Sequence, residues 1–155
     1  MRKAAIAFVG IMLALAVAGS AGAAEAGKVA VGATDLFRAA EQGDPRAQTQ
    51  VGLMYETGRG LPQDFMSASY WYRRAAEQGY PRAQELLGLM YDKGRGVGSN
   101  YIMAHKWLNL AASGAERGER EYFLRLRDAV AQKMTVAEVT EAQRLARYWR
   151  PLPER

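Results

Sequence analysis

The chain has no cysteine and only one histidine among its 155 residues. Without cysteine it forms no disulfide and carries no lipid on a cysteine, so its stability must come from the burial of apolar side chains. With one histidine and no cysteine, the chain also has few of the residues needed for common zinc sites or for the Ser–His–Asp and Cys–His arrangements of nucleophilic enzymes. We expect His105, the single histidine, to be a solvated helix residue rather than a general base or metal ligand.

Other signatures of chemistry are missing as well. No Ser-x-x-Lys sequence occurs, which argues against a penicillin-binding-type nucleophile. The Gly-Arg-Gly segments at 58–60 and 94–96 follow expected helices, and they lack the preceding strand and the Lys-Ser/Thr ending of a phosphate loop. We interpret them as helix ends. The sequence therefore predicts no catalytic residue, no metal site and no cofactor.

The charge balance is mildly basic, with a formal net charge of +5 and a sequence pI of 9.6. Basic residues alternate with acidic ones, as in EAQRLARYWR at 141–150. In nucleic-acid-binding proteins the basic residues instead cluster on one face, together with aromatic residues or known motifs. We predict no nucleic-acid partner and interpret the charge as a solvated surface, with an attraction to anionic polymers of the cell envelope left open.

The first 23 residues have the layout of a secretory signal peptide. A basic start is followed by an apolar run at 4–18 and by small residues at 19–24. We predict cleavage between Ala23 and Ala24, because the apolar run is short for a membrane span of roughly 20 residues. The alternative is an uncleaved anchor. We expect an exported protein without stable membrane insertion after cleavage.

The central part of the chain contains two segments of nearly identical sequence. AAEQGDPRAQ at 39–48 returns as AAEQGYPRAQ at 75–84, and GLMYETGRG at 52–60 returns as GLMYDKGRG at 88–96. The offset is 36 residues in both cases. A fixed period in this range is typical of stacked repeats, in which each unit buries its apolar face on a neighbour.

Each unit is predicted to be two helices joined by a loop. In the first unit, Asp44 and Pro45 mark a helix start and Gly58 marks its end. Asp64 caps a second helix that runs to about Gln78. Its apolar residues have the i, i+3, i+4, i+7 spacing of one helix face; they are Ala68, Trp71, Tyr72 and Ala75.

The second unit is predicted to have the same arrangement, with helices at 81–93 and 101–113. Asn100 caps the second of these helices, and the loop at 94–100 lacks the usual Pro and Asp, so we expect that loop to be looser. Trp71 and Trp107 occupy the same repeat position within apolar stripes. We therefore expect both to be core residues rather than platforms on which a ligand stacks.

These residues resemble a known family. The pattern A-x3-hG-x2-Y-x2-G-x-G-h, followed by D/N-x3-A-x2-W-h-x2-AA-x2-G, is similar to the Sel1-like repeat, a relative of the tetratricopeptide repeat. The resemblance covers about half of the chain. It implies an all-α fold, a short right-handed α-solenoid of antiparallel helix pairs, whose members mostly act as protein-interaction scaffolds. It also favours a bacterial periplasmic or secreted location.

The remaining segments are expected to flank and cap the repeats. A capping box at Thr135 and Glu138 opens the last helix. On the two C-terminal helices the predicted apolar faces are Tyr122, Phe123, Leu126 and Val130, and Val136, Val139, Ala142, Leu145 and Trp149. The predicted segments are a disordered linker at 24–33, an N-terminal capping helix at 34–43, repeat 1 at 44–79, repeat 2 at 80–114, and C-terminal capping helices at 115–150.

Positions at which the first helices of the two units differ, and their neighbours on the same face, are the candidates for partner contact. The resemblance places this face on the concave side of the solenoid. Its three leucines either form an apolar patch that anchors an extended or helical peptide or pack against neighbouring helices, and the sequence leaves both open. The candidates are Arg46, Thr49, Gln50, Leu53, Arg82, Glu85, Leu86, Leu89 and Lys93.

We therefore expect an exported, non-catalytic scaffold that binds a protein or peptide of the cell envelope. The alternative, suggested by the signal peptide and the basic surface, is a binder or weak hydrolase of peptidoglycan-like material. The sequence leaves the oligomeric state open.

Overall fold

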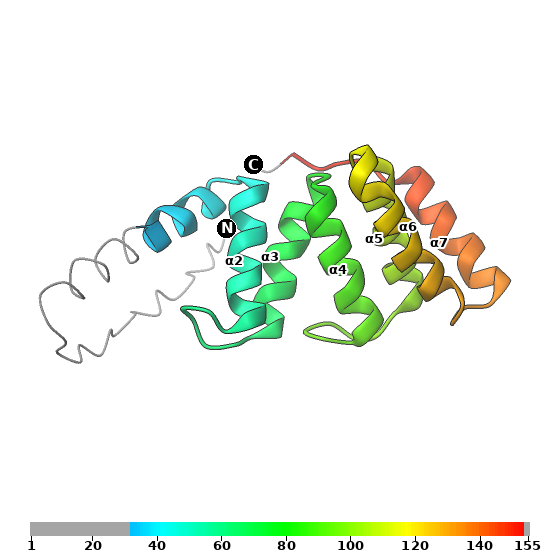
Figure 1. Cartoon of the computed structure of the whole chain (residues 1–155), viewed down its shortest axis with the longest axis horizontal. Helices are drawn as coiled ribbons and strands as arrows, with labels where there is room; N and C mark the ends of the chain where they lie inside the picture. The colour runs from blue at the N-terminus through cyan, green and yellow to red at the C-terminus, as the bar shows by residue number, and fades with distance from the viewer. Residues whose placement is uncertain (1–31, 154–155) are drawn as a thin grey trace, which may run out of the picture. The chain divides into compact units, whose positions relative to one another are not determined.

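The computed structural model describes residues 32–153. The predicted signal peptide and its cleavage site lie outside the described residues, as does most of the predicted linker. Residues 32–41 are helical, so the capping helix already includes residues 32 and 33, which the sequence placed in the linker. The other helices are α2 (Pro45–Thr57), α3 (Phe65–Glu77), α4 (Pro81–Lys93), α5 (Tyr101–Gly114), α6 (Arg117–Ala131) and α7 (Val136–Tyr148) (Figure 1). No strand occurs between residues 32 and 153, which confirms the all-α prediction.

The helix ends follow the predicted signals closely. The Asp44 carboxylate accepts hydrogen bonds from the backbone N–H groups of the first turn of α2, and Gly58 ends that helix with φ at 70°. The side chains of Asp64 and Asn100 cap α3 and α5 in the same manner. Thr135 opens α7 with a complete capping box. Local backbone chemistry therefore sets the length of each of these helices.

Consecutive helices pack on one another in antiparallel pairs. Helix α2 packs on α3, α3 on α4, and α4 on α5, while α5 receives both α6 and α7 (Figure 1). The predicted solenoid of helix pairs is therefore confirmed. Because α6 and α7 both pack on α5, the last repeat helix is covered on more sides than an ordinary member of the stack.

Two glycines at equivalent positions let the two helices of each repeat approach closely. A Cβ atom on Gly52 would lie 2.5 Å from Cε1 of Tyr72, and one on Gly88 would lie 2.9 Å from Cγ of Leu108. Tyr72 and Leu108 are both fully buried. Glycine at these positions therefore makes room for the large core residue of the neighbouring helix.

A glutamine at the same position of each repeat ties it to the preceding helix. Gln48 Nε2 donates to the backbone oxygen of Ala40 at 3.1 Å, and Gln84 Nε2 donates to that of Ala76 at 3.1 Å. Both amides are buried, so these bonds satisfy carbonyl groups at the ends of helices. The position 36 residues after Gln84 holds Arg120, which is exposed. The glutamine hydrogen bond is therefore present in both repeats but not in α6, the first capping helix.

The expectation for His105 was wrong. Its exposed fraction is 2%, and Ser69, the equivalent residue of the first repeat, is also buried. Burial lowers the pKa of the imidazole, and the neighbouring Arg127 lowers it further. Within the described residues Nδ1 of His105 has no hydrogen-bond partner. The residue is therefore part of the core.

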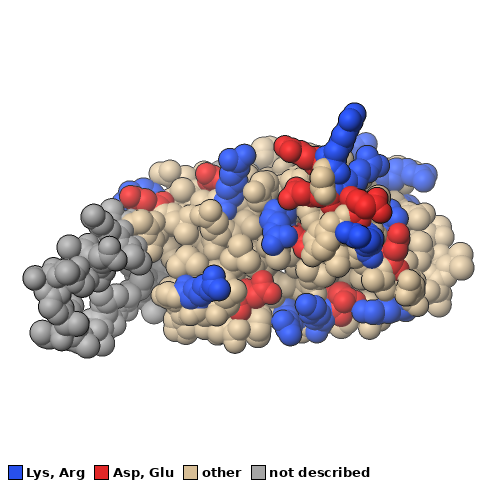
Figure 2. Space-filling model, in the orientation of Figure 1, with Lys and Arg blue, Asp and Glu red and all other residues tan. Residues whose placement is uncertain are grey.

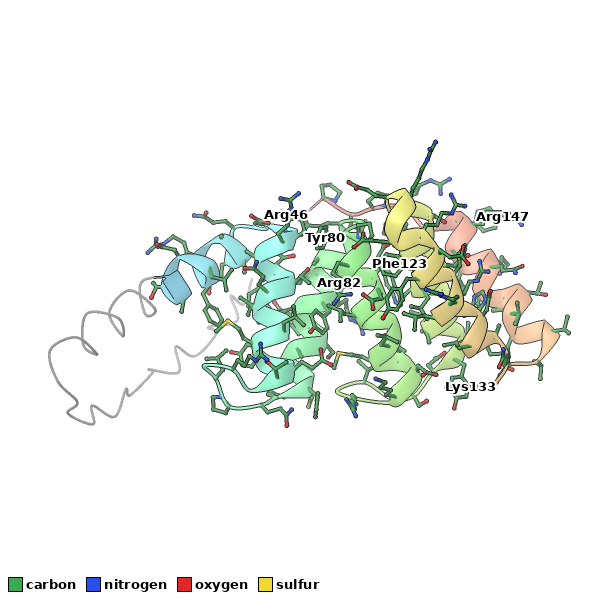
Figure 3. The ribbon with its side chains drawn as sticks, viewed as in Figure 1. Arg46, Tyr80, Arg82, Phe123, Lys133 and Arg147 are labelled. Carbon is green, nitrogen blue, oxygen red and sulfur yellow. The ribbon has the colours of Figure 1, made fainter. Side chains whose placement is uncertain are left out.

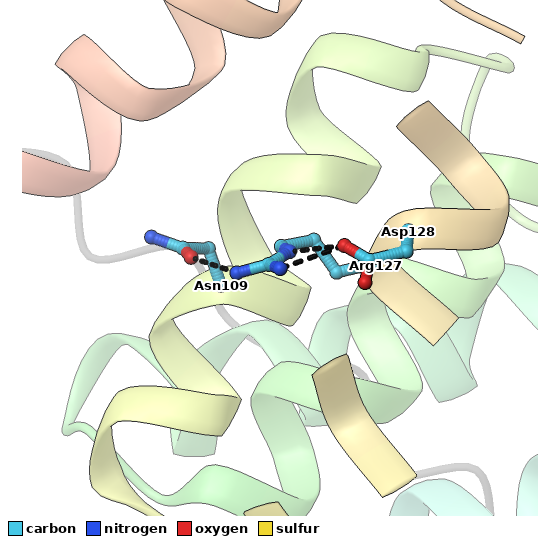
Figure 4. A network of polar contacts seen from close by, with 3 residues as sticks. All are labelled: Asn109, Arg127 and Asp128. Carbon is cyan, nitrogen blue, oxygen red and sulfur yellow. Dashed lines mark hydrogen bonds and ion pairs between the residues drawn. The ribbon is translucent and has the colours of Figure 1, made fainter. Parts of the chain in front are cut away.

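A polar contact beside this histidine joins α6 to α5. The Arg127 guanidinium donates to Oδ1 of Asn109 at 3.1 Å and to Oδ1 of Asp128 at 2.9 and 2.7 Å (Figure 4). Asn109 lies one helical turn after His105 on α5. The same face of α5 that buries the imidazole is thus fixed to the first capping helix.

Two residues of the predicted capping stripes are not in the core. Tyr122 is 42% exposed and Val136 is 85% exposed, while Phe123 and Ala142 are buried as expected. Val136 is the first residue of α7. The apolar pattern predicted these two helices correctly, but in each of them the first residue of the predicted buried face is exposed.

The loop at 94–100 is also more closely packed than expected. A Cβ atom on Gly96 would lie 1.9 Å from the backbone oxygen of Phe65, at the start of α3. The Ser69 hydroxyl donates to the backbone oxygen of Gly96 at 3.2 Å. The loop therefore joins the two repeats at this point, although Gly98 has open space around it.

Candidate functional site

The nine candidate partner residues divide by exposure. Three are buried: Thr49, Glu85 and Leu86 have exposed fractions of 4%, 1% and 8%. Leu86 belongs to the main hydrophobic core, which supports packing against neighbouring helices for this leucine. Leu53 and Leu89 are half-buried, and the exposed candidates are Arg46, Gln50, Arg82 and Lys93.

Glu85 is a buried carboxyl group with polar partners on α4 and α6. Arg82 donates to Oε2 of Glu85 at 2.5 Å, and the Tyr122 hydroxyl also contributes a hydrogen bond. Burial raises the pKa of Glu85, while Arg82 and Tyr122 act in the opposite direction. The carboxylate of this ion pair is therefore buried inside the molecule, whereas the Arg82 side chain is 47% exposed at the surface.

Two further carboxylates, on α2 and α4, also have polar partners within the molecule. Glu56 accepts a hydrogen bond from the Tyr72 hydroxyl at 2.6 Å. Asp92 pairs with Lys133 of α6 at 2.7 Å. Within residues 32–153 neither Arg46 nor Lys93 has an acidic partner, so α2 and α4 each present an exposed, unpaired cation.

An apolar depression lies along α2. It has a volume of about 260 Å³ and is lined by Gln50, Leu53, Met54, Thr57 and Arg59. Gln50, Leu53, Met54 and Thr57 have the i, i+3, i+4, i+7 spacing of one helix face. Gln50 and Leu53 are predicted site residues, and the structure brings them together here.

A second, polar depression lies where three helices begin. It has a volume of about 470 Å³ and receives Arg46 from α2, Tyr80, Pro81 and Arg82 from the start of α4, and Gly114, Ala115, Glu116 and Glu119 from the turn into α6. Figure 3 shows Arg46 and Tyr80 at neighbouring helix ends. Figure 2 shows basic and acidic side chains gathered together over the region of α6.

Sequence reasoning found Arg46 and Arg82 but missed their acidic counterparts. Glu116 and Glu119 follow the second repeat, in a segment where the repeat pattern has decayed, so a comparison of the two units does not reach them. The signal that could have found them is the period itself. The starts of helices at 45, 81 and 117 are 36 residues apart, which places all three at one edge of a stacked fold.

Some kinds of site are not found in the described part of the chain. Between residues 32 and 153 no group of three or more His, Cys, Asp and Glu side chains could hold a metal ion. Buried polar atoms without partners in this part are Nδ1 of His105 and Nε1 of Trp107, and neither residue lines a depression. No helix there has both the length and the apolar character needed to cross a membrane.

Comparison with known proteins gives a consistent result. The Sel1 repeat model matches residues 45–80 and 81–115. A Sel1 repeat protein from Oxalobacter formigenes is 40% identical, with a TM-score of 0.54, over 58% of this chain and 68% of that one. No curated protein matches.

A second solved structure resembles the described helices over a longer stretch. It is a protective antigen present in uropathogenic Escherichia coli strains that displays an SLR fold. It is 30% identical, with a TM-score of 0.69, over 76% of this chain. This chain spans 24% of that protein's length. Together with the repeat match and the Oxalobacter relative, this places the chain in the Sel1-repeat family.

Proposed function

We propose that this protein is an exported, non-catalytic scaffold that binds a protein or peptide segment on the surface formed by α2, α4 and the start of α6. The Sel1 repeat is a scaffold fold typical of protein–protein interaction. The observation that supports this surface is the position of both depressions, one along α2 and one at the starts of α2, α4 and α6. We name this surface the helix-A surface.

The chemistry of the helix-A surface suits a peptide better than a small molecule. Half-buried Leu53 and Met54 offer a shallow apolar contact beside the charged side chain of Arg59. Exposed Arg46 and Lys93 lie at opposite ends of the α2–α4 surface, near the start of α2 and the end of α4. An apolar anchor with charges around it is the usual arrangement for recognising a peptide.

The predicted signal peptide supports a location outside the cytoplasm. The first 23 residues carry the basic, apolar and small-residue regions of an export signal. The proposed partner is therefore a protein of the cell envelope. Export is tested by N-terminal sequencing of the protein recovered from the periplasmic fraction, where a start at Ala24 supports it and an intact Met1 in the membrane fraction contradicts it.

Binding is tested by affinity capture from envelope extracts after brief cross-linking. The binding variant combines Arg46→Glu with Leu53→Ser, which changes one lining residue of each depression. The control variant combines Met66→Ser with Tyr70→Ser, because these residues are 72% and 51% exposed on α3. We expect one envelope protein to be enriched with the wild type and the control but lost with the binding variant.

Two results would contradict the proposal. Equal capture by both variants would place the interface elsewhere, provided circular dichroism shows an unchanged helix content. Failure to enrich any protein, combined with co-sedimentation or turnover of purified cell-wall fragments, would favour the alternative role as a binder or weak hydrolase of peptidoglycan-like material.

A further inference from the structure

Opposite charges line the polar depression without neutralising each other. Arg46 and Arg82 come from α2 and α4, and Glu116 and Glu119 come from the start of α6. Within the described residues no ion pair or hydrogen bond joins either arginine to either glutamate. Arg82 is instead held by Glu85. The depression is therefore a gap between a basic side and an acidic side.

Two ion pairs show the simpler arrangement, in which both partners lie on one helix. Arg38 pairs with Asp35 and Arg144 with Glu141, each at 2.7 Å. In the depression the opposite charges come from different helices. A ligand with a negative and a positive group would form ion pairs with both sides at once.

Tyr80 and Pro81 add a partly apolar element to the lining of the depression. Tyr80 is half-buried and packs against the main core, and Pro81 is the first residue of α4. A volume of about 470 Å³ falls in the ordinary range for binding sites, about 300 to 1,000 Å³. These features favour a short stretch of chain with polar groups along it over a single ion.

We infer that this depression binds a dipolar peptide segment, in which an acidic group meets Arg46 and Arg82 and a basic group a few residues away meets Glu116 and Glu119. The inference rests on the proposed scaffold function and names the chemistry that its partner presents. The orientation is fixed by the fold, with the acidic group of the peptide toward α2 and its basic group toward α6.

The test uses capped peptides of defined charge and amide chemical-shift mapping on the full chain. The probes are acetyl-Asp-Glyₙ-Lys-amide peptides with zero to three glycines between the charges, titrated to about 10 mM so that weak binding is measured. Controls replace Asp by Asn or Lys by Gln. We expect one spacing to shift the amides of Tyr80, Arg82 and Glu119, and each neutral replacement to weaken binding by about two- to five-fold.

Charge reversal separates a dipolar site from simple attraction of anions. Arg46→Glu and Glu119→Lys should each weaken binding of the best peptide, and the double variant should recover part of it, because the peptide can then bind in the opposite direction. The matched controls are Arg147→Glu and Glu121→Lys, exposed residues outside the depression, and both should bind as the wild type does.

Three results would overturn the inference. Binding that Glu119→Lys strengthens would identify an anion site, such as one for an acidic envelope polymer. Equal binding of the charged and neutral peptides would remove the role of charge. No shift with any spacing would also refute it. If envelope capture still depends on the helix-A surface in that case, the scaffold proposal stands and only the dipolar site is lost.

Discussion

Replacing Gly52 by alanine tests the close approach between α2 and α3. The added Cβ would lie 2.5 and 2.6 Å from Cε1 and Cδ1 of Tyr72, well inside ordinary carbon contacts of about 3.5 to 4.0 Å. The Tyr72 ring is fully buried, and its hydroxyl donates to Glu56 at 2.6 Å. The ring cannot move away without losing this hydrogen bond or separating α2 from α3.

The expected magnitude follows from two opposing effects. Overpacking of a buried site typically costs about 1 to 3 kcal/mol, and loss of the Tyr72–Glu56 hydrogen bond would add about 1 kcal/mol. Alanine is the better helix former by about 1 kcal/mol, which offsets part of the cost. We expect the free energy of unfolding to fall by about 1 to 3 kcal/mol, or the melting temperature by roughly 4 °C per kcal/mol in a domain of this size.

The assay is urea unfolding followed by circular dichroism, with Gly118→Ala as the matched control. Gly118 is also a helical glycine, but a Cβ there meets nothing within 4 Å. We expect this control to be neutral or slightly stabilising. If Gly52→Ala is as stable as Gly118→Ala, the close contact between α2 and Tyr72 does not exist as described and the reasoning is refuted.

Three further predictions concern the loop, the buried histidine and the cap. Gly96→Ala should cost about 3 kcal/mol or more in thermal unfolding, because the residue has a φ of 66° and its Cβ would collide with the backbone oxygen of Phe65; a loss below 1 kcal/mol would contradict the packed loop. The pKa of His105 is lowered in the fold by burial, so the unfolded chain binds the extra proton first as the pH falls below 6.5. Relative to His105→Gln, the wild type should therefore lose stability from pH 6.5 downward by up to about 1.4 kcal/mol per pH unit, and a difference that does not change with pH would show that the imidazole is not buried. Thr135→Ala should remove the side-chain half of the capping box and cost about 1 kcal/mol by urea unfolding, whereas an unchanged midpoint would show that α7 does not depend on it.

The sequence predicts the repeat helices well because their limits are local. Asp44, Asp64 and Asn100 are side chains that cap the helix immediately after them, and Gly58 and Gly94 end the preceding helices with positive φ. These effects need no tertiary information. The 36-residue period then adds the order of packing, because equivalent residues must bury equivalent surfaces.

The burial of single polar residues was harder to predict. His105 was expected to be solvated, yet it is buried, and so is Ser69 at the equivalent position of the first repeat. Glu85 was read as a surface residue because it differs from Thr49, yet both are buried. Differences between repeats therefore mark a change in packing as readily as a surface used for a partner.

The polar depression could not be predicted from any one repeat. It combines the start of α2, the start of α4 and the turn into α6, and its acidic residues lie beyond the last full repeat. Pairwise comparison of the units identified Arg46 and Arg82 only. The composite site is a product of stacking, in which helix starts separated by one period share an edge.

The most direct test of the binding surface is photo-cross-linking in the living cell. A photo-reactive amino acid is placed at Gln50, which lines the apolar depression, or at Met66, which is 72% exposed on α3. We predict that the probe at Gln50 cross-links one envelope protein and that the probe at Met66 does not. Cross-linking of the same protein from Met66 alone would contradict binding on the helix-A surface.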